Sequence, residues 1–224
     1  MNPTPTGSSS AAAADSRMVS YAQNGEDVVL ERIFRHRKDG FFVDVGACHP
    51  VHDSVTHHFY LRGWRGINVE PQQAMFAELE LARPRDINLA VCVGSHRSVA
   101  TLHVTEDRGT STLDESLAKK YRALGRIRGE VEVEVITLSD IWQRHVAGRP
   151  VEFLKIDVEG LELQVLQGAD FGLVKPLVII VESVHPESCS PSHEAWEPLL
   201  LPHYQPFQLA AIDLTVCTGK HQHI

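Results

Sequence analysis

The sequence predicts an α/β protein built on a doubly wound, Rossmann-like parallel sheet. Short apolar runs alternate with amphipathic segments along most of the chain, and this order of strand, helix and strand is typical of such sheets. Four of the runs, at 41–45, 66–69, 151–156 and 177–181, are followed by an acidic residue or a glycine turn. Ligands bind where parallel strands end, so these positions are the first candidates for a site.

The composition indicates one domain in a reducing compartment. A chain of 224 residues with 43% hydrophobic content can bury one substantial core. The net charge of -8 and the scattered basic residues argue against a nucleic acid partner. No apolar run reaches the roughly 20 residues that span a bilayer, no secretory signal is visible, and the four cysteines lack disulfide or metal spacing. We therefore expect a cytoplasmic protein, with a disordered leader at 1–16 and one domain at 17–224.

The first strand is expected at 41–45, because this run is apolar throughout, as in a strand covered on both faces. It contains Asp44 and ends in a turn at Gly46. A helix with apolar side chains at helical spacing precedes it, and Gln23 and Asp27 at the start of that helix could cover a ligand beside the strand.

The second strand, 66–69, ends at Glu70, which lies 26 residues beyond Asp44. A carboxylate at this place in a nucleotide-binding sheet accepts the two hydroxyls of a ribose. The glycine-rich fingerprint that cradles a pyrophosphate is missing. A nucleoside without a pyrophosphate, such as S-adenosylmethionine, is therefore expected rather than NAD.

The middle of the chain continues the alternation. A third strand is expected at 87–93, and helices at 75–81, 117–124 and 140–146. The segments 100–104 and 130–136 alternate apolar and polar residues, which predicts an antiparallel excursion with one face in solvent. Its edge could form a homodimer.

Three carboxylates gather where the next two strands end. The run 151–156 leads to Asp157 and Glu159, and the run 177–181 leads to Glu182. Such a cluster requires that one group is protonated, or that a metal cation or a basic side chain compensates the charge. A divalent cation such as Mg²⁺ on Asp157 and Glu182 is one solution. Glu159 could also be only a helix N-terminal acid, and His193 on the following loop is a candidate general base.

Six short motifs follow one another along the chain: SYAQNGED at 20–27, FVDVGA at 42–47, DSVT at 53–56, GWRGINVEP at 63–71, STL at 111–113 and LKIDVEG at 154–160. In content and order they resemble the FkbM family of S-adenosylmethionine-dependent O-methyltransferases. The resemblance extends from residue 20 to about residue 201.

The resemblance implies the class I methyltransferase fold, with a seven-stranded sheet whose last strand is antiparallel. It also implies a role for each matching residue. Asp44, Gly46 and Ala47 would hold the methionine part of the cofactor, and Ser54 would touch its carboxylate. Glu70 would bind the ribose, 84–91 would pass the adenine, and Gln23 and Asp27 would close the pocket.

The implied reaction is transfer of a methyl group to a hydroxyl of a sugar, in a glycan or glycolipid precursor. Asp157 and Glu182 would bind a metal or orient the sugar, Glu159 would support them, and His193 would accept the proton. An NAD-type enzyme and a noncatalytic cofactor-binding protein are the alternatives. Two departures stand out: Pro206 interrupts the strand expected at 204–211, and His49 replaces the Asn or Asp expected after Cys48.

Overall fold

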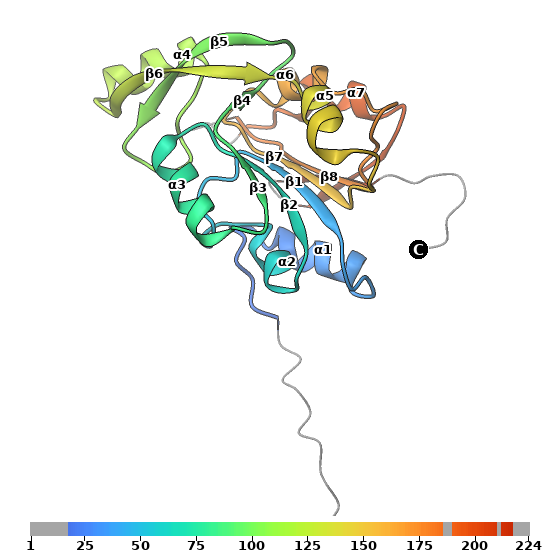
Figure 1. Cartoon of the computed structure of the whole chain (residues 1–224). Helices are drawn as coiled ribbons and strands as arrows, with labels where there is room; N and C mark the ends of the chain where they lie inside the picture. Colours follow the sequence, from blue (N-terminus) through green and yellow to red (C-terminus); the bar gives the residue numbers. More distant parts are fainter. Residues whose placement is uncertain (1–17, 186–189, 210–211, 217–224) are drawn as a thin grey trace, which may run out of the picture.

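The computed structural model describes residues 18–185, 190–209 and 212–216, so the predicted leader at 1–16 lies outside the described part of the chain. The main sheet is drawn in Figure 1. In the order in which they pair, its strands are β3 (Ile87–Leu89), β2 (Arg65–Val69), β1 (Phe41–Val45), β7 (Phe153–Ile156), β8 (Val178–Glu182), β10 (Ile212–Val216) and β9 (Gln205–Leu209).

The strand directions confirm the predicted parallel α/β sheet. All pairings from β3 to β8 are parallel. The last strand, β10, is antiparallel to β8 on one side and to β9 on the other. Pro206 lies within β9, at the edge of the sheet, where one missing backbone N–H is tolerated.

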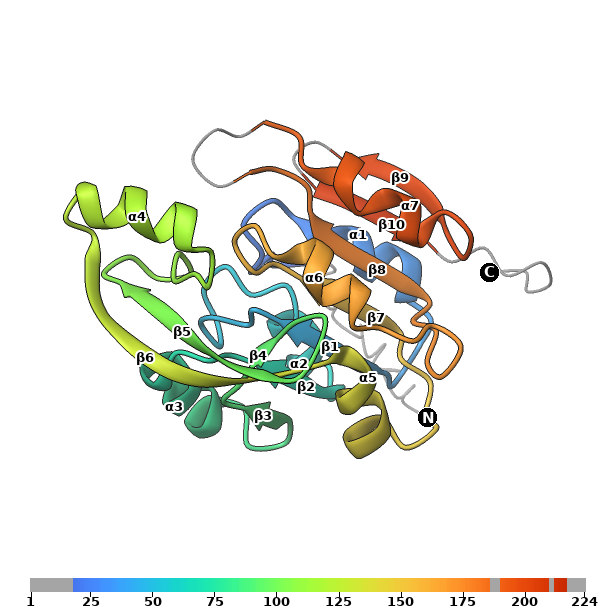
Figure 2. The same cartoon turned by 90° about the horizontal axis from the view of Figure 1, so that it is seen from above.

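Helices cover both faces of the main sheet (Figures 1 and 2). On one face lie α1 (Glu26–Phe34) and α2 (His57–Leu61), and on the other lie α5 (Leu138–Ile141), the π-helix η1 (Trp142–Val146), α6 (Glu162–Gln167) and α7 (Glu197–Leu200). The alternation of β1 separates the two cores. Phe42 packs with α1 and α2, whereas Phe41, Val43 and Val45 pack with the opposite layer.

A second, three-stranded sheet stands beside the carboxyl ends of the main strands (Figure 2). It contains β4 (Cys92–Val93), β6 (Ile127–Ile136) and β5 (Ser98–Thr105). In the chain, α4 (Glu115–Ala123) connects β5 to β6, and α3 (Gln73–Ala82) precedes the sheet. The antiparallel excursion is confirmed by the pairing of β5 with β6. The single strand predicted at 87–93 is wrong, because β3 and β4 belong to different sheets and the chain crosses between them.

A row of polar side chains crosses the main sheet. Asn88, Asn68, Asp44 and Lys155 occupy neighbouring registered positions on β3, β2, β1 and β7. The row lies on the face covered by α1 and α2, because Asp44 is two residues from Phe42 and Lys155 is two residues from Phe153. The apolar layer on this face therefore becomes polar toward the carboxyl ends of the strands.

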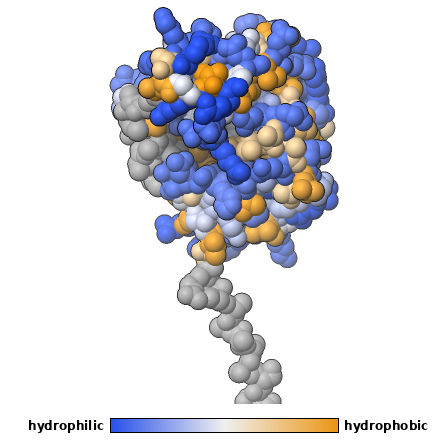
Figure 3. Space-filling view, turned by 90° about the vertical axis from the view of Figure 1, so that its left-hand side faces the viewer, coloured by the Kyte–Doolittle hydropathy of each residue, from blue (hydrophilic) through white to orange (hydrophobic). Residues whose placement is uncertain are grey.

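The surface in Figure 3 is largely hydrophilic, and hydrophobic residues form small separate groups on it. Within the described ranges, none of the helices combines the length and the apolar character that crossing a bilayer requires.

Candidate functional site

A cavity of about 350 Å³ opens where β1, β2, β7 and β8 end, and the second sheet forms its other wall. Its volume falls within the range of small-molecule sites, which is about 300–1,000 Å³. Of the predicted site residues, seven line it: Gln23, Gly46, Ala47, Glu70, Asp157, Glu159 and Glu182. The other four, Asp44, Ser54, Asp27 and His193, are not among its walls.

The turn after β1 allows the main chain to pass very close to the turn after β7. Gly46 has φ +80°, and a Cβ added there would lie 1.8 Å from the carbonyl oxygen of Asp157. Only glycine fits both conditions. The backbone N–H groups of Gly46 and Ala47 both donate to the carbonyl oxygen of Val69, at 3.0 and 3.1 Å. The turn is thus fixed to β2, and these two N–H groups already have an acceptor.

The carboxylate of Glu70 lines the cavity from the end of β2. It is 8% exposed. Its Oε2 accepts the N–H of Cys48 at 2.9 Å and its Oε1 accepts the N–H of Gln72 at 2.8 Å. Burial raises the pKa of Glu70, against the lowering effect of these two hydrogen bonds. Each oxygen still has a lone pair for a ligand hydroxyl.

His49 takes over the local role that an Asn or Asp would have in this loop. Its Nδ1 accepts the backbone N–H groups of Val51 and His52, at 3.0 and 2.9 Å. Nδ1 is therefore unprotonated, and the Nε2–H group faces Glu78 Oε2 at 3.2 Å. The loop keeps its polar contact despite the change of residue type.

Three predicted cofactor residues, Asp44, Asp27 and Ser54, lie behind the wall of the cavity. Asp44, 1% exposed, accepts a hydrogen bond from Thr56 Oγ1 at 3.0 Å. Asp27 accepts hydrogen bonds from Ser20 Oγ at 2.6 Å and from the N–H of Tyr21 at 2.7 Å, and so holds the segment that brings Gln23 to the cavity.

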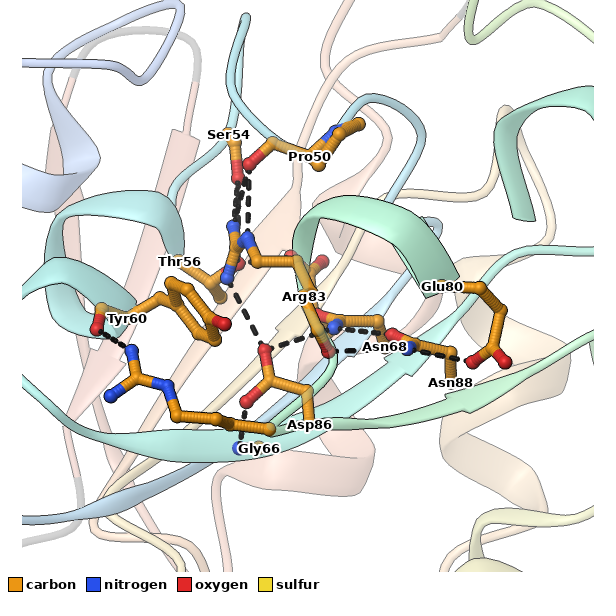
Figure 4. A network of polar contacts seen from close by, with 12 residues as sticks. Pro50, Ser54, Thr56, Tyr60, Gly66, Asn68, Glu80, Arg83, Asp86 and Asn88 are labelled. Atoms are coloured by element: carbon orange, nitrogen blue, oxygen red, sulfur yellow. Dashed lines mark hydrogen bonds and ion pairs between the residues drawn. The ribbon is translucent and has the colours of Figure 1, made fainter. Parts of the chain in front are cut away.

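Ser54 belongs to a buried network around Arg83 (Figure 4). The guanidinium of Arg83 donates to the carbonyl oxygen of Pro50 through Nε at 3.0 Å and Nη2 at 2.9 Å, and to Ser54 Oγ at 3.0 Å. Its Nη1 lies 3.3 Å from Asp86 Oδ2, and both side chains are fully or almost fully buried. Arg83 also lies 3.3 Å from Thr56 Oγ1, which connects it to the Asp44 carboxylate. The sequence reasoning did not identify Arg83.

The predicted carboxylate cluster lies at one end of the cavity. Glu159 has φ +56°, which is uncommon for a residue with a side chain. Burial, and then the nearby Asp157 and Glu162, raise the pKa of Glu159 to about 7. Burial, followed by Asp157, Glu159 and Glu162, raises the pKa of Glu182 to about 9, so Glu182 holds its proton at neutral pH. Protonation of one carboxylate, which is one of the three predicted ways to reduce repulsion in the cluster, is therefore met by Glu182.

A further carboxylate shapes the turn that carries Glu159. Glu162 Oε1 accepts the backbone N–H groups of Val158 and Gly160, both at 3.1 Å. Glu162 is 2% exposed, and burial raises its pKa. Glu162 lies in the first turn of α6, and its side chain folds back onto the preceding turn. Nothing in the sequence indicated this contact.

Lys155 supplies the basic group that the cluster requires, and the sequence reasoning missed it. Its Nζ donates to the carbonyl oxygen of Gly46 at 2.7 Å and lies 3.3 Å from Asp44 Oδ1 and 3.4 Å from Asp157 Oδ2. Burial lowers the pKa of Lys155, but the attraction of Asp44 and Asp157 outweighs burial and the net direction is upward. Lys155 is therefore charged.

In the described part of the chain, no group of three or more His, Cys, Asp or Glu side chains is arranged to hold a metal ion, so the metal expected on Asp157 and Glu182 has no support from such a group. Asp157 faces the Lys155 ammonium instead, with Nζ and Oδ2 3.4 Å apart. Mg²⁺ is held by one or two carboxylates together with several waters, and here the Asp157 carboxylate already faces a fixed positive charge that would repel the ion.

His193, the predicted general base, lies in the 3₁₀ helix η2 (His193–Ala195), beyond the walls of the cavity. Residues 186–189 of the same loop lie outside the described ranges. The opposite wall comes from a loop of the second sheet that includes Arg108 and Ser111. Gln72 Nε2 donates to Ser111 Oγ at 3.4 Å, and Arg108 lies 3.9 Å from Glu78. The loop is thus tied to α3 and to the residue before it.

Comparison with known proteins gives a family match over most of the chain. The model of the family described as "Methyltransferase FkbM domain" matches residues 44–208. No curated protein matches the chain. Among solved structures, a Staphylococcus aureus protein assigned as a caffeoyl-CoA O-methyltransferase is 9% identical, with TM-score 0.49 over 90% of this chain and 86% of that one. The fibrillarin/Nop5p complex is 12% identical, with TM-score 0.42 over 88% and 80%.

Proposed function

The chain belongs to the methyltransferase FkbM domain family, and on this premise we propose that it is an S-adenosylmethionine-dependent O-methyltransferase acting on a sugar hydroxyl in a glycan or glycolipid precursor. One observation carries the proposal beyond the family. The glycine turn at Gly46, the Glu70 carboxylate and the acidic cluster at Asp157 all line one cavity. A nucleoside site and a polar acceptor site therefore adjoin each other.

The walls of the cavity support a direction for the cofactor. Gly46 and Ala47 would adjoin its methionine part, and Glu70 would accept the ribose hydroxyls. The apolar wall contains Met75 on α3, Val91, and residues of β4 and β5 in the second sheet. This wall would hold the adenine. Asp44, Ser54 and Asp27 would act from behind, by fixing the loops that the cofactor touches. The order of the strands, with β10 reversed, supports the class I form of the fold.

When bound, S-adenosylmethionine supplies a methyl group already activated by its sulfonium. The residues of this chain have two tasks: to hold the acceptor hydroxyl in line with that methyl group and to take up the hydroxyl proton. Alignment of two reactants can lower a barrier by about 7–11 kcal/mol. Asp157 and the protonated Glu182 would orient the sugar through hydrogen bonds.

Glu159 is better supported than His193 as the proton acceptor. It lines the cavity, and its pKa of about 7 suits a general base at neutral pH. Glu159→Gln should lower kcat by about 100-fold, within the usual range for removal of a general base, whereas His193→Ala should have a much smaller effect. The reverse order of the two variants would return the role to His193.

Methyl transfer to a panel of defined mono- and oligosaccharides tests the function. Asp157→Ala should abolish transfer and leave the affinity for S-adenosylmethionine nearly unchanged. Glu70→Ala should weaken that affinity by about 10- to 100-fold, because hydrogen bonds to a charged group contribute about 1.5–3 kcal/mol. Glu132→Ala, an exposed position on β6, is the matched control. Calorimetry that detects NAD binding and no S-adenosylmethionine binding would overturn the proposal.

A further inference from the structure

The ammonium of Lys155 lies at the position that a cation shared by Asp44 and Asp157 would occupy. Its ammonium is enclosed between the carboxylates of Asp44 on β1 and Asp157 at the end of β7, and its side chain is 9% exposed. Asp44 and Lys155 are direct neighbours in the register of the two strands, and both project to the same face. The position of the charge is therefore set by the pairing of two central strands.

One hydrogen bond and two ion pairs hold this ammonium. A lysine ammonium has three N–H donors. Three oxygens face it: the carbonyl oxygen of Gly46 at 2.7 Å, Asp44 Oδ1 at 3.3 Å and Asp157 Oδ2 at 3.4 Å. A divalent cation at the same place would compete with a fixed, largely buried positive charge for the same oxygens. The carboxylates of Asp44 and Asp157 therefore have their cation within the chain.

We propose that Lys155 replaces a divalent cation in this site: it is a positioning residue that holds the Asp157 carboxylate beside the Gly46 turn, and methyl transfer is independent of added metal. This inference rests on the proposed function and deepens it. The Gly46 turn adjoins the methyl donor and Asp157 orients the acceptor. One ammonium that contacts both turns fixes the two reactants relative to each other.

Removing the ammonium should affect both sides of the reaction. Asp44 and Asp157 would then repel each other across neighbouring strands, and the carbonyl oxygen of Gly46 would lose its partner. Lys155→Met should lower kcat by about 100-fold, the effect of losing one preorganised electrostatic contact. Lys155→Arg, which keeps the charge, should recover part of kcat. Lys119→Met, at an exposed position on α4, is the control and should match the wild type.

The decisive experiment compares the wild-type enzyme with and without a strong chelator, and with Mg²⁺ or Mn²⁺ added back. We expect rates that agree within about twofold; enzymes that use a catalytic metal lose most of their rate on its removal. Loss of transfer on chelation, with recovery on add-back, would overturn the inference and leave the proposed function intact. If the wild type transfers no methyl group to any acceptor, the proposed function fails first.

A double-mutant cycle separates positioning from a general structural role. If Lys155 acts through Asp157, the loss in kcat for Lys155→Met combined with Asp157→Asn should be close to that of the larger single change. Losses that multiply would contradict the inference. Should Lys155→Met fail to fold, the same cycle with Lys155→Arg and the chelator experiment on the wild type still decide the question.

Discussion

Asp44 and Asp157 are both acidic residues near the end of a central strand, yet only Asp157 reaches the cavity. Asp44 lies inside β1, and the alternation of that strand directs it to the face covered by α1 and α2. Asp157 is one residue beyond β7, where the backbone leaves the strand. A shift of two positions relative to the strand end thus separates a supporting carboxylate from one that can face a ligand.

The proton held by Glu182 should make stability depend on pH. Folded Glu182 keeps its proton to about pH 9, whereas the unfolded chain loses it near 4.5. Its stabilising contribution is complete below about pH 4.5 and is lost as the pH rises through about 9. Thermal melts between pH 5 and 9 should show a falling Tm in the wild type and a flatter curve in Glu182→Gln.

The exposed Glu132→Gln serves as the control for this pH series and should keep the wild-type slope. Equal slopes in Glu182→Gln and the wild type would show that Glu182 is already ionised at neutral pH.

Cavity-lining residues at strand ends could be predicted from the sequence, whereas the contacts of residues inside strands, such as Asp44 and Lys155, could not. Gly46, Glu70 and Asp157 stand out because an apolar run stops there and parallel strands end at one edge. Lys155 interrupts an apolar run. From a single sequence, a lysine at such a position would be expected to face solvent. Its meaning depends on Asp44 in a strand more than 100 residues away. Cross-strand pairing of that kind is not visible in local patterns.

At the scale of elements, the turn after β1 is the least tolerant of change. Gly46→Ala should destabilise the protein by about 3 kcal/mol or more, because the left-handed backbone and the clash with Asp157 add together. Gly63→Ala is the matched control. Its φ is +94° but an added Cβ would meet nothing within 4 Å, so about 1–2 kcal/mol is expected. Denaturant unfolding measures both, and equal losses would mean that the close approach is not rigid.

The network of Arg83 should hold the loop that follows the Gly46 turn. Arg83→Met leaves the Asp86 carboxylate buried without its cation, which should cost about 3–5 kcal/mol. Arg85 is the control, since both guanidinium groups lie over the ring of Tyr60, at 4.8 and 4.0 Å, but Arg85 is exposed. Arg85→Met should cost less than about 1 kcal/mol. Urea unfolding of the two variants provides the comparison, and similar losses would refute the role of the buried network.

The sequence predicted most elements but not all their boundaries or sheets. The strand expected at 87–93 divides into β3 and β4 because the chain leaves one sheet for another while it remains apolar. The helix expected to begin at residue 140 begins two residues earlier, as α5, with Thr137 as its N-cap in a capping box with Asp140. Both errors have the same origin: hydrophobic periodicity reports burial, and it does not report which partner buries a residue.

At the scale of the whole molecule, the cavity joins two sheets with separate cores. Cys92, Leu102, Val133 and Val135 form the core of the second sheet, and two of them, Cys92 and Leu102, also line the cavity. A ligand there would contact both sheets. We expect S-adenosylmethionine to slow amide hydrogen exchange in residues 108–113 as well as in the Gly46 turn. Exchange in residues 30–34, the second half of α1, should not change, and unaltered exchange at 108–113 would show that the second sheet takes no part in binding.

The polar row of Asn88, Asn68, Asp44 and Lys155 also bears on how the chain finds one alignment of its strands. Apolar strands buried on both faces can slide past each other by two residues with little change in burial. In the observed alignment of β1 and β7, Asp44 lies beside Lys155. A slide by two residues would place Asp44 beside Phe153 instead, and the buried charges of Asp44 and Lys155 would both lose their partner. The charges that adjoin the cavity therefore also exclude misaligned sheets, so a variant at either position should be checked for misfolding as well as for activity.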